Sequence, residues 1–306
     1  MKRTRERGML LLPVALTLAV IGALAYTMTR EGSMNASAVD AQYEIETARY
    51  LAASGAQVAK WRTAKDKCAN KGARANFSSL TLPGGTVDAE LTKWDKGVLT
   101  VSVTVKAAAS AGRRGGAVHA LTREMPVHNL ADPKEKTFIG GEDTVIVKND
   151  NSNRSGEDSL VATDDTSLPL VRFELPGEMD NALITQANMK LTRQGPNATP
   201  ADRSLGVHRI TRAWSSSSVT WTTPWAAPGG DYVEQAAASL QIDQNPPPPG
   251  GAYVFPIHSL VQGWVDDRLR NHGMLLKPTR LINARFTSFE GASKPELYVH
   301  YYLRCT

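Results

Sequence analysis

The sequence is poor in the residues that most catalytic and metal sites need. It holds two cysteines in 306 residues, which excludes a disulfide-rich scaffold and a four-thiolate zinc site. Its six histidines show no metal-ligand spacing, and the common hydrolase, metalloprotease, thiol-redox and P-loop motifs are missing. We therefore expect a protein that is not an enzyme and has no certain cofactor.

An excess of charge of one sign is also lacking, because positive and negative residues nearly balance beyond the first few residues. The formal net charge is +5, and the basic leader at residues 1–8, MKRTRERG, supplies more than half of it. Nucleic-acid binding needs a clustered basic face, so we expect no nucleic-acid partner. Hydrophobic residues make up 42% of the chain, enough to bury a sizeable core, and 17 prolines with 24 glycines indicate a turn-rich, β-rich body.

The one long apolar run lies near the amino terminus. Residues 9–26, MLLLPVALTLAVIGALAY, carry no charge. A helix of this length measures about 27 Å, close to the thickness of a bilayer's hydrocarbon layer. The basic residues before it would place the amino terminus in the cytoplasm and the body outside. The competing interpretation is a secretory signal peptide that is cut after Ala25.

Strong helix formers continue this run to about Lys67, which predicts one long helix over residues 9–67 with a transmembrane N-terminal part. A short basic leader ending in glycine, an apolar helix and an amphipathic continuation together resemble the type IV pilins. The resemblance implies cleavage after Gly8, methylation of Met9 and anchoring in the inner membrane, with the body in the periplasm. It also implies packing against other pilin subunits through the helix in an extracellular filament. Pro13 stands where major pilins carry Glu, which favours a minor pilin.

After the helix the period of the apolar residues changes to that of strands. Apolar and polar residues alternate over 87–92 and 99–106, so residues 68–128 are expected to form a small antiparallel sheet, as in pilins. The polar segment 129–137 is the expected linker.

The two cysteines are candidates for one disulfide bond although they lie far apart in the sequence. Cys68 follows the predicted helix and Cys305 precedes the last residue. Outside the cytoplasm such thiols oxidise, which predicts a disulfide between them. Two unpaired or intermolecular thiols are the alternative.

Residues 138–306 alternate short apolar segments with Gly, Pro, Asn and Asp, which predicts an all-β sandwich of the jelly-roll type. This region resembles the DNRLRE domain family, some members of which are grouped with carbohydrate-binding modules. The matching motifs follow in the family's order: Leu170–Leu175, Trp214, Val219–Trp221, Leu260–Trp264 and Asn271–Gly273. Pro256 and Phe289 depart from the family pattern, which leaves the fold prediction intact and puts the transfer of ligands in doubt.

Tryptophan is the residue to consider for glycan binding, because sugar rings stack their C–H faces on exposed aromatic rings. Trp225, in a loop, is the candidate ligand-binding ring, whereas Trp214, Trp221 and Trp264 lie in the family motifs and are expected in the core. Sandwich domains of this kind often hold one structural calcium ion. Asp143 and Glu290 are the candidate carboxylate ligands for it.

The complete prediction is an α+β N-terminal part of pilin type, with a long transmembrane helix and a small antiparallel sheet, followed by the all-β sandwich. The predicted function is a non-enzymatic minor-pilin-like component of a bacterial type IV pilus that presents the sandwich for adhesion or binding of a surface glycan. One alternative is a secreted or membrane-anchored carbohydrate-active protein with the sandwich as an accessory module. Another is a purely structural filament subunit.

Overall fold

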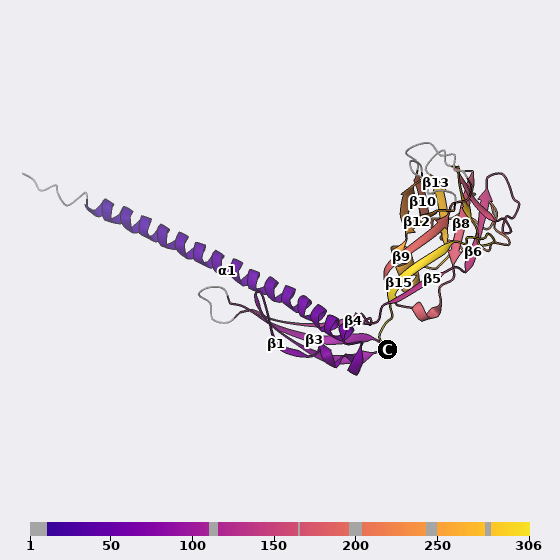
Figure 1. The fold of residues 1–306 in the computed structure, drawn as a ribbon. Coiled ribbons are helices and arrows are strands. Elements are labelled where there is room, and N and C mark those ends of the chain that lie inside the picture. Colours follow the sequence, from indigo (N-terminus) through magenta and orange to yellow (C-terminus); the bar gives the residue numbers. More distant parts are fainter. Residues whose placement is uncertain (1–10, 110–115, 165, 196–203, 243–249, 279–282) are drawn as a thin grey trace, which may run out of the picture. The chain divides into compact units, whose positions relative to one another are not determined.

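The structure is a computed structural model, and it describes residues 11–109, 116–164, 166–195, 204–242, 250–278 and 283–306 (Figure 1). The chain divides into two compact units, Met1–Val127 and His128–Thr306. The predicted processing residues Gly8 and Met9 lie outside the described residues.

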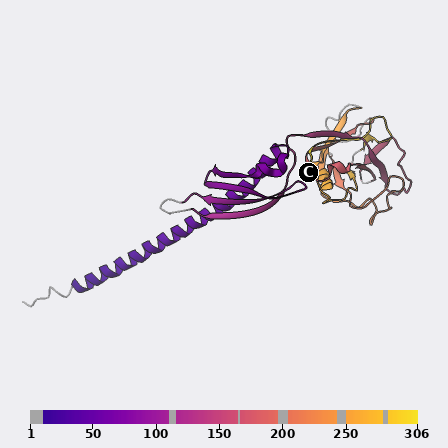
Figure 2. The ribbon, with the colours of Figure 1, turned by 90° about the horizontal axis from the view of Figure 1, so that it is seen from below.

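The first unit consists of a long helix and a four-stranded antiparallel sheet. Helix α1 (Leu11–Lys65) has 55 residues, and its C-terminal half lies along one face of the sheet (Figures 1 and 2). Because Gly55 has no side chain, α1 can come close to the sheet there: a Cβ atom on Gly55 would lie 2.5 Å from Cγ1 of Val87. The remaining elements are η1 (Ala69–Ala75) and the strands β1 (Phe77–Leu82), β2 (Gly85–Asp95), β3 (Val98–Ala107) and β4 (Val118–Pro126), paired in that order.

The prediction of a transmembrane segment is wrong for the chain as described. Among the described residues, no helix contains a stretch that is both long and apolar enough to cross a bilayer. Residues 9 and 10 of the predicted span lie outside the described residues, and polar residues, among them Thr27, Thr29 and Arg30, follow the apolar run within α1. The fold class and the inner-membrane localisation predicted above are corrected accordingly.

The second unit is a sandwich of two antiparallel sheets. The larger sheet has the order β11-β10-β13-β8-β7-β14, with β6 also paired to β8, and the smaller one has the order β12-β9-β15-β5. The strands are β5 (Lys134–Phe138), β6 (Gly141–Val147), β7 (Ser159–Thr163), β8 (Ser167–Phe173), β9 (Leu183–Thr192), β10 (Ser204–Arg209), β11 (Ala238–Gln241), β12 (Ala252–Pro256), β13 (Met274–Pro278), β14 (Asn283–Thr287) and β15 (Glu296–Tyr302).

The main core of this unit lies between the two sheets. Fully buried side chains from both sheets meet there, including Phe173, Met189, Phe255 and Phe286. Helix α2 (His258–Val265) adds Val261 and Trp264 to the same cluster, and the short helix η2 (Gly177–Met179) adds Met179.

Two sequence predictions about the connections between the units can be compared with the structure. Strand β5 begins inside the predicted linker 129–137 and pairs with β15 at the edge of the smaller sheet, where its charged residues stay at least partly exposed and Phe138 is buried. The linker is therefore shorter than expected. Both cysteines are disulfide-bonded, and because the chain contains no others, the predicted bond between Cys68 and Cys305 is confirmed.

A second, smaller core lies on the outer face of the larger sheet. Successive residues of a strand point to opposite faces, so Val145 joins the main core while Ile146 joins this second cluster. The loop between β10 and β11 covers that face and contributes Trp214, Val219 and Trp225 to the cluster. The loop therefore has a core of its own, which fixes the position of the site described next.

Candidate functional site

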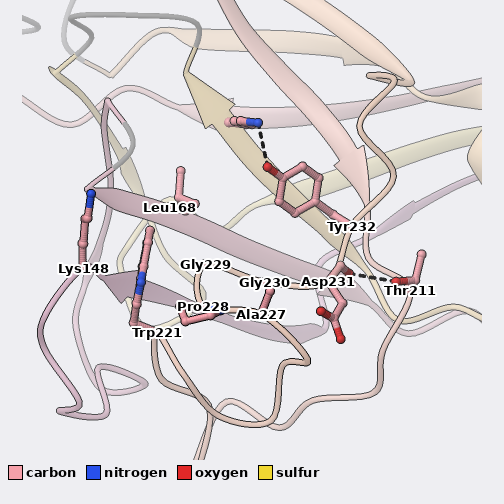
Figure 3. A pocket seen from close by; sticks show the side chains of 11 residues that line it. Lys148, Leu168, Thr211, Trp221, Ala227, Pro228, Gly229, Gly230, Asp231 and Tyr232 are labelled. Carbon is pink, nitrogen blue, oxygen red and sulfur yellow. Dashed lines mark hydrogen bonds between the residues drawn. The ribbon is translucent and has the colours of Figure 1, made fainter.

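A pocket of about 630 Å³ lies at this loop, beside the larger sheet (Figure 3). Backbone from the Ala227–Gly230 turn forms one part of its wall. The polar and aromatic side chains that line it are Lys148, Thr211, Trp221, Asp231, Tyr232 and Lys277. The pocket thus combines two aromatic rings, two cations, a carboxylate and two hydroxyl groups.

Trp221 is half-buried, and its ring lines the pocket. The carbonyl oxygen of Trp221 accepts a hydrogen bond from the Gly229 N–H at 2.8 Å. Gly229 has a φ of +99°, and a Cβ atom there would lie 3.2 Å from the indole ring. Both the positive φ and the close approach favour glycine. The turn therefore holds the backbone tightly against one part of the ring.

Tyr232 and Lys277 form a fixed pair elsewhere in the pocket. The Lys277 ammonium group donates hydrogen bonds to the Tyr232 hydroxyl oxygen at 2.6 Å and to a Glu234 carboxylate oxygen at 2.9 Å. Its nitrogen also lies 4.9 Å from the centre of the Tyr232 ring. Burial acts to lower the pKa of Lys277, but the bonds to Tyr232 and Glu234 outweigh it and raise the pKa. Lys277 is therefore a cation at neutral pH.

Asp231 stabilises the loop between β10 and β11. Its carboxylate accepts hydrogen bonds from the Ala226 N–H at 3.0 and 3.1 Å and pairs with the Arg212 guanidinium group. Its backbone carbonyl accepts a hydrogen bond from the Thr211 N–H at 2.8 Å. The bond from Ala226, together with Arg212, lowers the pKa of Asp231. The carboxylate therefore stays ionised and holds both ends of the turn.

The structure places the two loop tryptophans differently from the prediction. Trp225, predicted as the exposed ring, is only 7% exposed and belongs to the second core, where its indole N–H donates to the Thr220 carbonyl at 2.9 Å. Trp221, expected in the core, is half-buried: it packs against the second core and also lines the pocket. Trp214 and Trp264 are buried. The signal that could have identified Trp221 is the Pro-Gly-Gly-Asp turn that follows it, whose glycines permit close packing against a ring.

The predicted calcium ligands Asp143 and Glu290 do lie together. Asp143 is 2% exposed, accepts a hydrogen bond from the Phe289 N–H at 2.7 Å and is hydrogen-bonded to the Glu290 side chain. Burial and the neighbouring Glu290 raise the pKa of Asp143 to about 8, although the Phe289 bond acts against this. Asp143 is therefore protonated at neutral pH.

A calcium ion takes six to eight oxygen ligands, and two carboxyl groups supply only part of such a set. In the described ranges, no group of three or more His, Cys, Asp and Glu side chains is placed to hold a metal ion. The residues present thus do not fit the predicted calcium site.

Comparisons with known proteins bear on the second unit. No curated protein matches the chain. A solved chain titled "Structure of infectious bursal disease virus Gt strain" is 9% identical, and the match covers 75% of this chain and 60% of that one with a TM-score of 0.15. A likeness this weak carries no argument about fold or function. The model of carbohydrate-binding module family 96, in contrast, matches residues 134–301. Since this match covers more than half of the chain and contains the whole sandwich with its pocket, the protein belongs to carbohydrate-binding module family 96.

Proposed function

We propose that the second unit binds a carbohydrate in the pocket beside Trp221. Membership of a carbohydrate-binding family supports a binding role for this unit. The single observation that carries the choice of site is the partly exposed Trp221 ring in a pocket lined with polar groups. Sugars present C–H faces to aromatic rings and hydroxyl groups to charged and polar side chains, so one site must offer both.

The size of the pocket suits a short saccharide. Ligand pockets commonly measure about 300–1,000 Å³, and the pocket at Trp221 has about 630 Å³. In Figure 3 the Lys148 and Trp221 side chains lie toward one end of the pocket and Tyr232 toward the other. A sugar ring stacked on Trp221 would thus have Lys148 within reach of its hydroxyl groups.

The fixed pairs in the pocket favour binding because they need little reorganisation. Lys277 is held by Tyr232 and Glu234, and Asp231 by Arg212 and the backbone of the turn. Side chains that are already ordered lose less conformational entropy when a ligand arrives. Lys148, by contrast, is exposed and forms no ion pair in the described part of the chain, so its ammonium group is available to a ligand.

The test is binding of the full chain to an immobilised glycan array, followed by calorimetry on the best sugar. Trp221→Ala should weaken binding about 5- to 150-fold, if the ring contributes as much as the stacking of a nucleobase on one aromatic ring, about 1–3 kcal/mol. The matched control is Tyr302→Ala, which truncates an aromatic ring of β15, a strand of the smaller sheet. Equal losses in the two variants, or no loss with Trp221→Ala, would place the sugar elsewhere.

We further propose that the chain is non-enzymatic and acts outside the cytoplasm. In the described lining of the pocket, Asp231 is the sole carboxylate. It is already paired with Arg212 and hydrogen-bonded to the Ala226 N–H of the turn. Glycosidic bond cleavage uses a pair of carboxyl groups that flank the bond. The disulfide supports an oxidising location. A chain that releases reducing sugars from the glycan it binds would contradict the first proposal and support the alternative of a carbohydrate-active protein.

For the first unit we propose a role as a pilin-like subunit of a filament. The support is a set of large apolar side chains that stay exposed on α1: Ile21, Leu24, Tyr26, Met28, Val39 and Tyr43. Packing against helices of other subunits would bury them. Sedimentation should show the full chain in oligomers and a chain without residues 1–38 as a monomer with an unchanged near-ultraviolet spectrum. A monomeric full chain would contradict this role.

A further inference from the structure

A second pocket lies at the C-terminal end of α1, in the first unit. It has a volume of about 470 Å³ and is lined by Trp61, Arg62, Lys65, Asp66, Arg74 and Asn76. Four of these residues come from the last turns of α1 and its end, and the other two from the end of η1 and the residue after it. It lies outside residues 134–301, so the family match assigns it no role. We call this pocket, with its six lining residues, the α1 pocket.

The α1 pocket is rich in positive charge. Three of its side chains are cations and one is a carboxylate. The carboxylate of Asp66 is neutralised by Arg74, whose Nε lies 3.2 Å from it. In the part of the chain that the structure describes, Arg62 and Lys65 form no ion pair. These two cations therefore remain uncompensated.

Aromatic rings hold these two cations in place. The Lys65 ammonium nitrogen lies 4.8 Å from the centre of the Trp61 ring, and the Arg62 guanidinium carbon lies 4.7 Å from the centre of the Phe77 ring. A cation over a ring face is attracted by the ring's quadrupole. This attraction orients the cation without a carboxylate, so its N–H groups on the other side stay available to an anion.

The α1 pocket also offers an apolar surface. The Trp61 side chain is 52% exposed although it lies beside Lys65. A ligand that fits must therefore combine an anionic group with a rigid apolar face a few ångströms away. Sugars that carry a carboxylate or sulfate group have this combination, because the anionic group and the C–H face belong to one ring. The side chains of an acidic peptide carry the anion but no rigid apolar face.

We propose that the α1 pocket binds an anionic sugar, with its carboxylate or sulfate group on Arg62 and Lys65 and its ring against Trp61. This is a second binding activity of the chain, in a different unit from the proposed carbohydrate pocket, and it does not depend on that pocket. Electrostatic attraction carries much of it, so the affinity should fall as salt rises. Between about 0.01 M and 1 M ionic strength the Debye length shortens from about 30 Å to 3 Å.

The experiment uses the full chain with Trp221→Ala, so that the pocket of the second unit is disabled. Calorimetry would measure binding of a galacturonate tetrasaccharide, a heparin-derived sulfated tetrasaccharide, cellotetraose as the neutral sugar, and tetraglutamate as the acidic peptide. We expect binding of one or both anionic sugars, no binding of cellotetraose, and weaker binding at high salt. The two anionic sugars distinguish a carboxylate from a sulfate ligand.

Variants then locate the binding. Arg62→Gln with Lys65→Gln should weaken binding of the anionic sugar at least tenfold, and glutamine is nearly as good a helix former as the residues it replaces. Lys93→Gln with Lys106→Gln makes the same change in net charge on β2 and β3 and should leave binding unchanged. Trp61→Ala should weaken sugar binding. It should leave the fold of the first unit intact, because the Trp61 side chain is exposed on the surface of α1.

The proposal is overturned if neither anionic sugar binds, if both charge variants lose binding equally, or if tetraglutamate binds as tightly as the sugars. The proposed function of the second unit is measured separately, as the loss caused by Trp221→Ala in the otherwise native chain. Either proposal can therefore fail without the other.

Discussion

The buried carboxyl group of Asp143, beside Glu290, should make the second unit less stable as the pH rises from about 4 to 8. An aspartate in an unfolded chain has a pKa of about 3.9, and in the folded chain the pKa of Asp143 is about 8. Between these values the folded state binds one more proton than the unfolded state. Stability falls with pH wherever the folded state binds more protons, so the stabilising effect of the protonated group is complete below about pH 4 and is lost as the pH passes about 8.

The slope of this dependence follows from the proton count. One extra proton in the folded state lowers the free energy of unfolding by about 1.4 kcal/mol for each unit of pH. Asp143→Asn removes the titration but retains an oxygen that can accept the hydrogen bond from the Phe289 N–H and an amide that can donate to Glu290. The difference in stability between the native chain and this variant should therefore shrink by about 1.4 kcal/mol per unit between about pH 5 and 7.

The assay is urea unfolding at several pH values, followed by tryptophan fluorescence. Trp61→Phe and Trp94→Phe remove the two tryptophans of the first unit, so that the signal comes from the second unit alone. Asp132→Asn, an exposed change in the same unit, is the control and should keep the native slope. If Asp143→Asn shows the same pH slope as the native chain, Asp143 is ionised in the folded state and the argument fails.

Three other results are expected. Trp225→Ala should destabilise the second unit by about 3–5 kcal/mol in urea unfolding, because it empties the second core; a cost below about 1 kcal/mol would mean that this ring is not packed. Gly55→Ala should destabilise the first unit by about 1–3 kcal/mol, since the added Cβ atom would lie 2.5 Å from Val87 and the strand must move; an unchanged urea midpoint would contradict the close approach. A protease site inserted after Leu130 should yield two fragments on a reducing gel but one species on a non-reducing gel, and Cys305→Ser should yield two on both; two fragments without reductant in the native background would exclude the disulfide.

Periodicity predicted the strands of both units because their buried faces are long and regular. The alternation over 99–106 corresponds to β3, where Leu99, Val101, Val103 and Val105 are all fully buried. The linker was overestimated because the charged residues of Lys134–Phe138 look like a loop, whereas an edge strand tolerates charge on its solvent side.

The pocket could not be predicted, because it depends on how an irregular loop folds over a sheet. Trp221 and Trp225 are four positions apart in one loop, and sequence alone gives no periodicity that distinguishes the buried ring from the half-buried one. Their placement is decided by the turn at Gly229 and Gly230 and by the carboxylate of Asp231, contacts that only the tertiary structure supplies. The sequence analysis named Asp143 and Glu290 together as calcium ligands, but it did not foresee the burial of Asp143, which raises the pKa of this carboxyl group.

The separate core beneath the β10–β11 loop has a consequence for how this module can diversify. Residues that shape the proposed carbohydrate pocket are anchored on the outside of the larger sheet, away from the interior between the sheets. If that pocket binds the carbohydrate, as proposed, insertions or exchanges in the loop would alter which ligand is recognised without disturbing the scaffold. Grafting a different loop onto Ile146, Leu168, Leu170 and Leu275 is accordingly a direct route to modules of new specificity.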